Sequence, residues 1–261
     1  MLHWNIDPTL LHLGPLELRW YGLFFGGGFL LGYFWVVWFY RREGKPERNV
    51  DNLLVVMAIS TMLGARLGHF LFYDFKLFLS DPLVLFRFWE GGLASHGSGI
   101  GIVIGAYLYS RKHPQEPLIW VLSRLCIPAS MIGGLIRIGN FFNSEILGIP
   151  TTLPWGVVFE RFDYVPRHPA QLYEAIAYLS ISGLLQLFYL KGGRKGPPIR
   201  ILALYWILIF TVRFFVEFIK INQVDFESSL PLNMGQILSI PLILLGFVFF
   251  IWPQWIQKKV S

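Results

Sequence analysis

Long apolar runs separated by short polar stretches dominate the sequence. Seven runs come close to the length of about 20 residues that a helix needs to cross a bilayer. They cover residues 20–40, 53–73, 93–110, 118–139, 172–190, 200–220 and 235–252, with each boundary approximate. Backbone polar groups in hydrocarbon must pair within the segment, and runs of alternating polarity, as in a membrane barrel, are not visible. The pattern therefore predicts an all-α polytopic membrane protein, with residues 1–261 as one integral-membrane domain.

The composition agrees with this prediction. Of the 261 residues, 54% are hydrophobic and only 15% are charged, whereas soluble domains carry about a quarter charged residues. The high hydrophobic content excludes disorder and a collagen-like fibre. A disulfide scaffold is excluded because Cys126 is the only cysteine. A net charge of +6 would suggest a nucleic-acid surface in a soluble protein, but here the membrane explains it better, so we expect no nucleic-acid partner.

The basic residues predict an orientation. Twelve Lys and Arg fall in the loops after the first, third and fifth runs and in the C-terminal tail, whereas six fall on the opposite side, where acids outnumber them. By the positive-inside rule, the N-terminus is outside and the C-terminus inside, which seven spans make consistent. The longest loop, about 140–171, then lies outside. The first run lacks a basic leader and a cleavage site, so we interpret it as a helix rather than a signal peptide.

We single out five charged residues inside the apolar runs. Each costs roughly 2.5 to 3.5 kcal/mol to insert and so needs a partner, water or a function. They are Arg66, Arg124, Arg137, Arg213 and Glu217. Arg213 and Glu217 are four residues apart, so an ion pair that only neutralises itself explains them equally well. Their net charge of +3 leaves an anion missing, and a lipid phosphate would supply it.

Arg137 and Asn140 lie three residues apart at the outer end of the fourth run, with Asn143 and Glu145 just beyond. An arginine can donate two hydrogen bonds to a phosphate, an asparagine can add another, and Gly139 lets the backbone approach a ligand closely. The alternative is an arginine that reaches the interface where the helix ends. On this stretch alone, both readings stand.

His96 lies among glycines just before the third run, at the predicted outer boundary. Histidine is the side chain best suited to take a proton near neutral pH, although a lone histidine is more often structural. Arg167 and His168 precede Pro169 at the start of the fifth run, where a basic pair at a helix N-terminus suits an anion. The glycine pairs 64 and 68, and 101 and 105, have the spacing of close helix packing, and we assign them no chemistry.

These motifs, in this order, resemble the bacterial prolipoprotein diacylglyceryl transferase family over nearly the whole chain. The resemblance rests on Trp20-Tyr21-Gly22; Gly91-Gly92 with Ser95-His96-Gly97; Arg137-Ile138-Gly139-Asn140-Phe141 with Asn143, Glu145 and Gly148; Arg167-His168-Pro169 with Gln171-Leu172-Tyr173-Glu174; Arg213 with Glu217; and Met234-Gly235-Gln236 through Pro241. The chain departs from the family pattern at Ser98, Ile136 and Ser144, where glycine is common, and at Arg124, where we expect an acid.

The resemblance implies that the protein moves a diacylglyceryl group from phosphatidylglycerol to the thiol of a lipobox cysteine in a prolipoprotein signal peptide. Glycerol phosphate is released in this first step of lipoprotein maturation. The implied place is the bacterial cytoplasmic (inner) membrane, with membrane lipid around the protein and the active site toward the outer face. No cofactor and no metal are expected.

The resemblance also implies roles for eight residues. We expect Arg137 and Arg213 to stabilise the phosphate, Glu217 to orient Arg213, and His96 to act as the base. The residues expected to bind substrate are Tyr21, Arg137, Asn140, Glu145 and Gly148.

Two other functions compete with this one. An intramembrane serine protease could use Ser98 and His96, but the Gly-x-Ser-Gly order and a second, suitably placed histidine are missing. An anion transporter or a lipid-binding structural protein could use intramembrane arginines without chemistry, but the matched broken helices of a transporter are not evident. A zinc hydrolase lacks its His-Glu-x-x-His helix.

Overall fold

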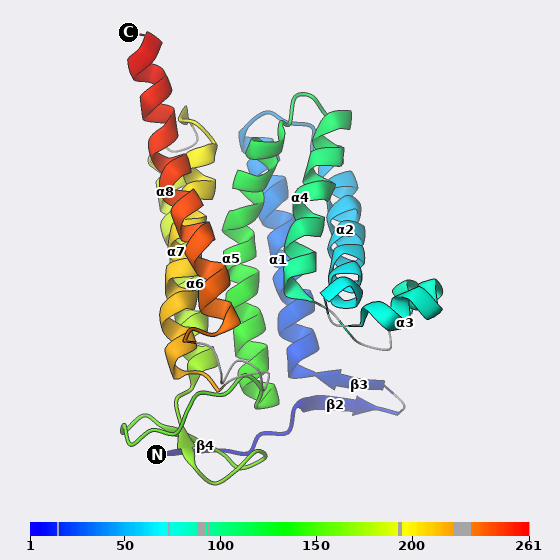
Figure 1. The fold of residues 1–261 in the computed structure, drawn as a ribbon, viewed down its shortest axis with the longest axis vertical. Helices are drawn as coiled ribbons and strands as arrows, with labels where there is room; N and C mark the ends of the chain where they lie inside the picture. Colours follow the sequence, from blue (N-terminus) through cyan, green and yellow to red (C-terminus); the bar gives the residue numbers. More distant parts are fainter. Residues whose placement is uncertain are drawn as a thin grey trace. The chain divides into compact units, whose positions relative to one another are not determined.

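In the computed structural model, the chain is mainly helical (Figure 1). The structure describes residues 1–14, 16–72, 74–87, 92, 94–192, 195–221 and 231–260. Within these ranges, it describes the side chains of all residues except 13, 16, 72, 95, 96 and 252–260.

Each of the seven predicted runs forms a helix. The long helices are α1 (Trp20–Arg42), α2 (Arg48–Phe72), α4 (Ser95–Lys112), α5 (Leu118–Asn143), α6 (Ala170–Leu190), α7 (Ile199–Val216) and α8 (Met234–Val260). Among the described residues, five of them, α1, α2, α5, α7 and α8, are long and apolar enough to cross a membrane. The all-α membrane fold is therefore confirmed, whereas the count of seven spans and the orientation stay predictions.

Shorter elements complete the fold. The helix α3 (Phe75–Ser80) and the 3-10 turn η1 (Pro82–Phe86) follow α2, and the turn η4 (Glu217–Ile219) continues α7. The sequence pattern did not predict two small sheets, which contain β1 (Leu2–Trp4), β2 (Thr9–Leu13), β3 (Leu16–Arg19), β4 (Val157–Phe159) and β5 (Pro166–Arg167). One sheet has the order β1-β4-β5, and β2 pairs with β3 as a hairpin.

The chain divides into two compact units. Unit 1 contains residues 1–34 and 125–261, and unit 2 contains residues 35–124. The division falls inside α1 and inside α5, so each of these helices contributes to both units. The prediction of one domain is untested by this division.

In unit 2, α2 and α4 pack side by side through glycines (Figure 1). A β-carbon at Gly97 would lie 2.1 Å from the carbonyl oxygen of Gly64, and one at Gly101 would lie 2.1 Å from the carbonyl oxygen of Ser60. Both distances are far below van der Waals contact. The glycines thus let two backbones approach to a distance that any side chain would prevent, as their spacing predicts.

Two of the intramembrane arginines have protein partners in unit 2. Arg124 donates from Nε and Nη2 to the two carboxylate oxygens of Glu43, at 2.8 and 3.1 Å. Arg66 donates to backbone carbonyls around η1, including that of Arg87 at 2.8 Å, and also to that of Val84. Arg124 is thus neutralised by the protein, and Arg66 holds the chain that follows α2, so neither needs a lipid phosphate.

In unit 1, the predicted outer loop folds onto the N-terminal strand. β1 pairs in parallel with β4, which pairs antiparallel with β5. Val157 and Phe159 of β4 form a buried apolar cluster with Phe141 and Leu147. The end of α5, the start of α6 and the end of α7 all lie beside this sheet (Figure 1), so the sheet gathers three helix ends in one place.

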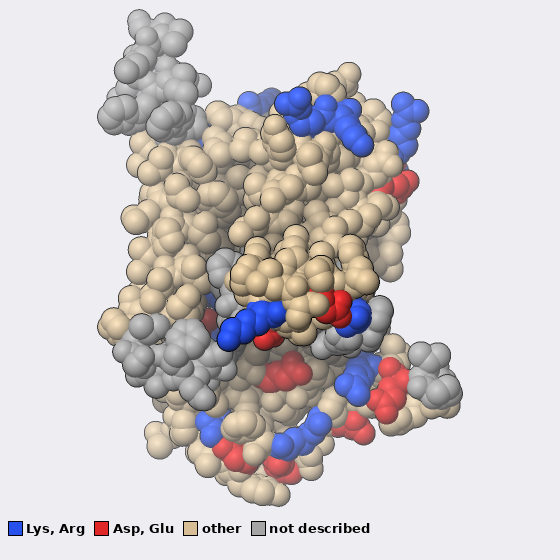
Figure 2. Space-filling model, turned by 45° about the vertical axis from the view of Figure 1, so that its right-hand side comes forward, with Lys and Arg blue, Asp and Glu red and all other residues tan. Residues whose placement is uncertain are grey.

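Charged side chains are distributed unevenly over the surface. On the face in Figure 2, Lys, Arg, Asp and Glu gather near the helix ends, and the surface over the helix middles is uncharged. Large apolar side chains are exposed on these helices, among them Leu30, Phe34, Val103 and Leu244. Such a surface is suited to lipid rather than water.

Candidate functional site

Most of the predicted site residues lie in unit 1. Arg137 and Asn140 lie in the last two turns of α5, whereas Glu145 and Gly148 follow in the loop. Arg213 lies near the end of α7, Glu217 begins η4, and Tyr21 lies in the first turn of α1. His96 lies in the first turn of α4 in unit 2, and its side chain lies outside the described residues.

At the end of α5, three polar side chains form a chain of hydrogen bonds. Arg137 donates from Nη1 to Oδ1 of Asn140 at 3.3 Å. Asn140 in turn donates from Nδ2 to Oε2 of Glu145 at 3.1 Å, and Asn143 donates to the other oxygen of Glu145 at 3.1 Å. The prediction that Arg137, Asn140 and Glu145 act together therefore agrees with their geometry.

The main partner of Arg137 is Glu174 of α6. Nε of Arg137 lies 2.8 Å from Oε2 of Glu174, whose side chain is completely buried. Gly134 makes this reach possible, because a β-carbon there would lie 2.8 Å from Cγ of Leu179 and force α5 away from α6. The side chain of Arg137 itself is 16% exposed, so part of it stays accessible beside this buried carboxylate.

Lys220 joins this pair to the end of α7. Its Nζ lies 2.8 Å from Oε1 of Glu174 and 3.0 Å from Oε1 of Glu217. Lys220 is thus shared by two buried carboxylates. It connects the cluster around Arg137 to that around Arg213.

The interaction between Arg213 and Glu217 is looser than their spacing suggested. Nε of Arg213 lies 3.9 Å from Oε1 of Glu217, beyond hydrogen-bond distance, whereas Lys220 lies closer to the same oxygen. Nδ2 of Asn233 also donates to Oε2 of Glu217, at 3.3 Å. The Arg213–Glu217 ion pair is therefore present but loose, and Glu217 is shared with Lys220. Arg213, 32% exposed, keeps donors available for another partner.

Sequence reasoning missed two members of this cluster, Glu174 and Lys220. Glu174 lies inside the apolar run 172–190 and is as unexpected there as Glu217 is in its own run. Lys220 follows Arg213 by seven residues and Glu217 by three, which is the spacing of one helix face. A count of both signs of charge in every run would have found Glu174. It would also have reduced the expected surplus of positive charge.

Two glycines of the site have structural reasons to be glycine. A β-carbon at Gly139 would lie 3.0 Å from Cδ2 of Tyr21, so the group that approaches Gly139 is a side chain of α1 rather than a ligand. A β-carbon at Gly148 would lie 2.4 Å from the carbonyl oxygen of His168 and 2.9 Å from that of Ile219. Gly148 therefore lies where two other backbone segments meet, and substrate contact by Gly148 stays a prediction.

Arg167 is engaged by the protein, contrary to its expected role at an anion site. It donates from Nε to both oxygens of Asp163, at 3.1 and 3.0 Å, and from Nη1 to the carbonyl oxygen of Gly148 at 3.3 Å. The arginine holds the pKa of the Asp163 carboxyl below its ordinary value through these hydrogen bonds. Arg167 thus ties the β4–β5 turn to the loop that carries Glu145.

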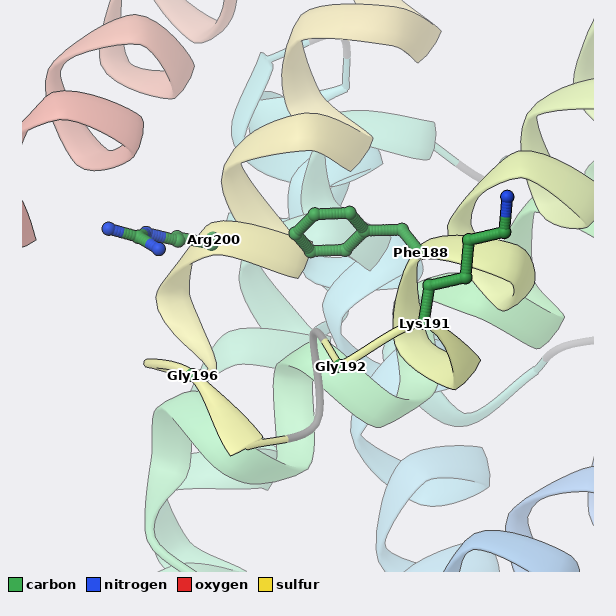
Figure 3. Close-up of a pocket in the computed structure, with 5 residues that line it drawn as sticks. All are labelled: Phe188, Lys191, Gly192, Gly196 and Arg200. Atoms are coloured by element: carbon green, nitrogen blue, oxygen red, sulfur yellow. The ribbon is translucent and has the colours of Figure 1, made fainter.

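A cavity of about 440 Å³ lies elsewhere in unit 1, where α6 ends and α7 begins (Figure 3). It is lined by Phe188, Lys191, Gly192, Gly196 and Arg200, none of which belongs to the cluster. Lys191 and Arg200 point away from one another in this view, and so they do not converge on one ligand. Size alone therefore does not identify the site, whereas the converging charges do.

Comparisons with known proteins identify the family of the chain. Residues 8–252 match the profile of the family described as prolipoprotein diacylglyceryl transferase. A protein of Tolumonas auensis named phosphatidylglycerol--prolipoprotein diacylglyceryl transferase is 44% identical over 96% of this chain and 97% of its own length. A protein of the same name from Chloroherpeton thalassium is 44% identical over 94% of this chain and 91% of its own length. One from Geobacter sulfurreducens is 40% identical over 93% of this chain and 93% of its own length. The chain therefore belongs to the prolipoprotein diacylglyceryl transferase family.

Proposed function

We propose that the protein transfers the diacylglyceryl group of phosphatidylglycerol to a prolipoprotein, the first step of lipoprotein maturation. Family membership over residues 8–252 supports this activity. The observation that carries the site assignment is the pair of arginines, Arg137 and Arg213, attached to one buried charge cluster and both partly exposed. Such a site suits an anionic lipid headgroup.

The reaction places new negative charge on the phosphate. The sulfur of the cysteine attacks the diacylglyceryl carbon that carries the phosphate, and a carbon–sulfur bond forms as the carbon–oxygen bond breaks. The bonding electron pair leaves with the oxygen of glycerol phosphate, while the thiol proton passes to a base. The phosphate gains charge in this step. Two arginines in a low-dielectric site therefore stabilise the transition state more than they stabilise the bound lipid in its ground state.

The neighbouring polar groups have supporting roles in this proposal. Asn140, held by Glu145, adds a donor beside Arg137. Glu217 orients Arg213 by charge. Tyr21 of α1 lies against Gly139, which is in the same turn of α5 as Arg137. Gly148 shapes the loop that carries Glu145. The proposed substrate-binding set consists of Tyr21, Arg137, Asn140, Glu145 and Gly148.

His96 is the proposed base. A thiol with an ordinary pKa near 8.5 is only a few per cent ionised at neutral pH, so a proton acceptor speeds the attack. Histidine suits this role because its ordinary pKa lies near 6.5.

The second substrate is a prolipoprotein signal peptide with a lipobox cysteine. The proposed location is the bacterial cytoplasmic (inner) membrane, with the site toward the outer face, where the positive-inside rule places the loop 140–171. Phosphatidylglycerol would then come from the surrounding bilayer.

The activity is tested with purified protein in detergent, phosphatidylglycerol and a lipobox peptide. We expect the peptide to gain the mass of a diacylglyceryl group, with one glycerol phosphate released per peptide. A peptide with serine in place of cysteine is the control and should stay unmodified. Lipid binding without either product would favour a lipid-binding or transport function instead.

Two variants test the assigned roles. We expect Arg137→Gln to lower kcat/KM at least a hundredfold, because a charge-assisted contact to the phosphate is lost, while the exposed Arg111→Gln stays near wild type. We expect His96→Gln to lower kcat with little change in KM. Wild-type turnover in either variant would reject that residue's role.

A further inference from the structure

Glu174 and Lys220 are the most completely buried charges of the cluster, and the proposed chemistry does not use them. The side chain of Glu174 is 0% exposed and that of Lys220 only 2%. Burial of a charge is costly unless it is paired, so these two residues are paired with each other at 2.8 Å. Their other contacts indicate what the pair does.

Glu174 pairs with Arg137 by charge at Nε, without an aligned hydrogen bond to its Oε2. Its Oε2 lies 2.8 Å from that nitrogen, and Tyr178 donates its hydroxyl to the other oxygen of Glu174 at 3.2 Å. A buried carboxylate this close to Nε restricts the directions in which the planar guanidinium presents its terminal nitrogens. Among the described residues, the one hydrogen-bond partner of those terminal nitrogens is Asn140. Glu174 thus fixes the direction in which Arg137 can donate.

Lys220 balances the charge of the site. Around it lie two arginines, Arg137 and Arg213, and two buried carboxylates, Glu174 and Glu217. The exposed Glu145 adds a third carboxylate through Asn140. Without Lys220, the carboxylates would outnumber the cations in a site that must accept an anionic phosphate. With it, the two buried carboxylates hold the arginines without making the site negative.

The fold fixes Lys220 by backbone pairing. Ile149 donates to the carbonyl of Ile219 at 2.9 Å, and Ile221 donates to that of Leu147 at 3.1 Å. Gly148 lies opposite Lys220 in this pairing, where a side chain would not fit. The lysine is therefore placed by the loop that also carries Glu145, rather than by helix geometry alone.

We propose that Glu174 and Lys220 are a positioning pair for the transfer reaction. Glu174 aims the guanidinium of Arg137 at the departing phosphate, and Lys220 supplies the positive charge that lets an anionic lipid bind beside two buried carboxylates. This inference rests on the proposed roles of Arg137 and Arg213. It adds Glu174, which contacts Arg137, and Lys220, which contacts the carboxylates of Glu174 and Glu217; neither is assigned a contact with the substrate.

The test separates aiming from charge. Glu174→Gln, Lys220→Met, Lys220→Arg and the double variant Glu174→Gln/Lys220→Met are purified in detergent. Their kcat and their KM for phosphatidylglycerol, as mole fraction in mixed micelles, are measured per folded enzyme from a single gel-filtration peak. Lys191→Met, which removes an exposed lysine outside the cluster, is the control and should keep wild-type kinetics.

The proposal predicts different kinetic constants for the two residues. Glu174→Gln should lower kcat at least tenfold with KM unchanged or lower, because the charge of Arg137 remains but its direction is lost. Lys220→Met should raise KM about tenfold, and Lys220→Arg should stay within about threefold of wild type, because the positive charge is kept. The double variant restores the charge balance, so its KM should return to within about threefold of wild type while its kcat stays low.

Other results would overturn the proposal. These are a wild-type kcat in Glu174→Gln, a wild-type KM in Lys220→Met, or a double variant whose losses simply multiply. If Lys220→Met yields no folded protein, the double variant decides alone: low kcat with near-normal KM supports the pair, and wild-type kcat rejects it. If Arg137→Gln is fully active, the proposed function of the arginines fails. If Arg137→Gln is inactive while the pair variants behave as wild type, only the positioning pair fails.

Discussion

At the residue scale, Glu145 lies between two residues with left-handed backbone. Ser144 and Ile146 both have φ of 56°, a conformation that costs a residue with a β-carbon about 1 kcal/mol or more. The turn brings the carboxylate of Glu145 back to the side chain of Asn140, which lies in the last turn of α5. The strain is therefore located where the loop returns a functional side chain to α5.

This strain predicts that Ser144→Gly stabilises the protein. Glycine adopts positive φ without steric cost, and the hydroxyl oxygen of Ser144 is buried without a hydrogen-bond partner among the described residues. We expect a gain of about 1 kcal/mol in the free energy of unfolding, measured as a higher Tm in detergent.

Ser98→Gly is the matched control for that change. Ser98 lies inside α4, so glycine there should lower stability by roughly 0.5 to 1 kcal/mol. A lower Tm in Ser144→Gly would contradict the strain at this turn.

At the element scale, the packing of α2 on α4 depends on backbone contact. Gly101 faces the carbonyl of Ser60, whereas Gly99, on the same helix, has no other atom within 4 Å of its would-be β-carbon. The same substitution at these two positions therefore has opposite consequences.

We expect Gly101→Ala to destabilise the protein by about 2 kcal/mol, because α2 must move away from α4. Gly99→Ala should be neutral or should stabilise by up to about 1 kcal/mol, since alanine favours a helix. Thermal unfolding of both variants in detergent is the measurement. Equal Tm values would show that α2 and α4 do not need this close approach.

The β4–β5 turn should depend on pH through Asp163. Arg167 lowers the pKa of Asp163 below its ordinary 3.8, so the folded state binds this proton more weakly than the unfolded chain. The stabilisation is therefore present above about pH 4 and is lost as the pH falls through the lowered pKa. Amide hydrogen exchange across residues 148–167 should quicken at that pH in the wild type, whereas Asp163→Asn should exchange quickly at every pH. Identical exchange at pH 6 would refute the coupling.

At the scale of the whole molecule, orientation follows from loop charge. The protein should insert with its N-terminus outside and its C-terminus inside, because twelve of the loop and tail cations lie on one side. Single cysteines at Asn5 and Ser261, in a Cys126→Ser background, test this with a membrane-impermeant maleimide. Asn5→Cys should react in intact spheroplasts, and Ser261→Cys should react only after lysis. The reverse pattern would invert the assignment, and labelling of both in intact cells would contradict an odd number of spans.

The positions of the helices and the family could be predicted from the sequence, but the contacts between distant segments could not. Each long helix contains most of its apolar run, since a run of apolar residues is a local property, although α8 continues to Val260, beyond the predicted end at about residue 252. The strands β1 and β4 were not predicted, because three-residue strands 155 positions apart carry little local signal. The sequence also did not indicate that Lys220 lies closer than Arg213 to the same oxygen of Glu217.

The sequence by itself determined the membrane class, the helices, the family and the polar residues near the site. Tertiary structure alone decided which charges meet: Arg124 with Glu43, and Arg137 with Glu174 and Lys220. The reason is physical, since an apolar run is recognised by its own composition, whereas an ion pair depends on two segments that approach through packing. Gly134 and Gly148 permit that approach here, and neither reveals its neighbour in the sequence.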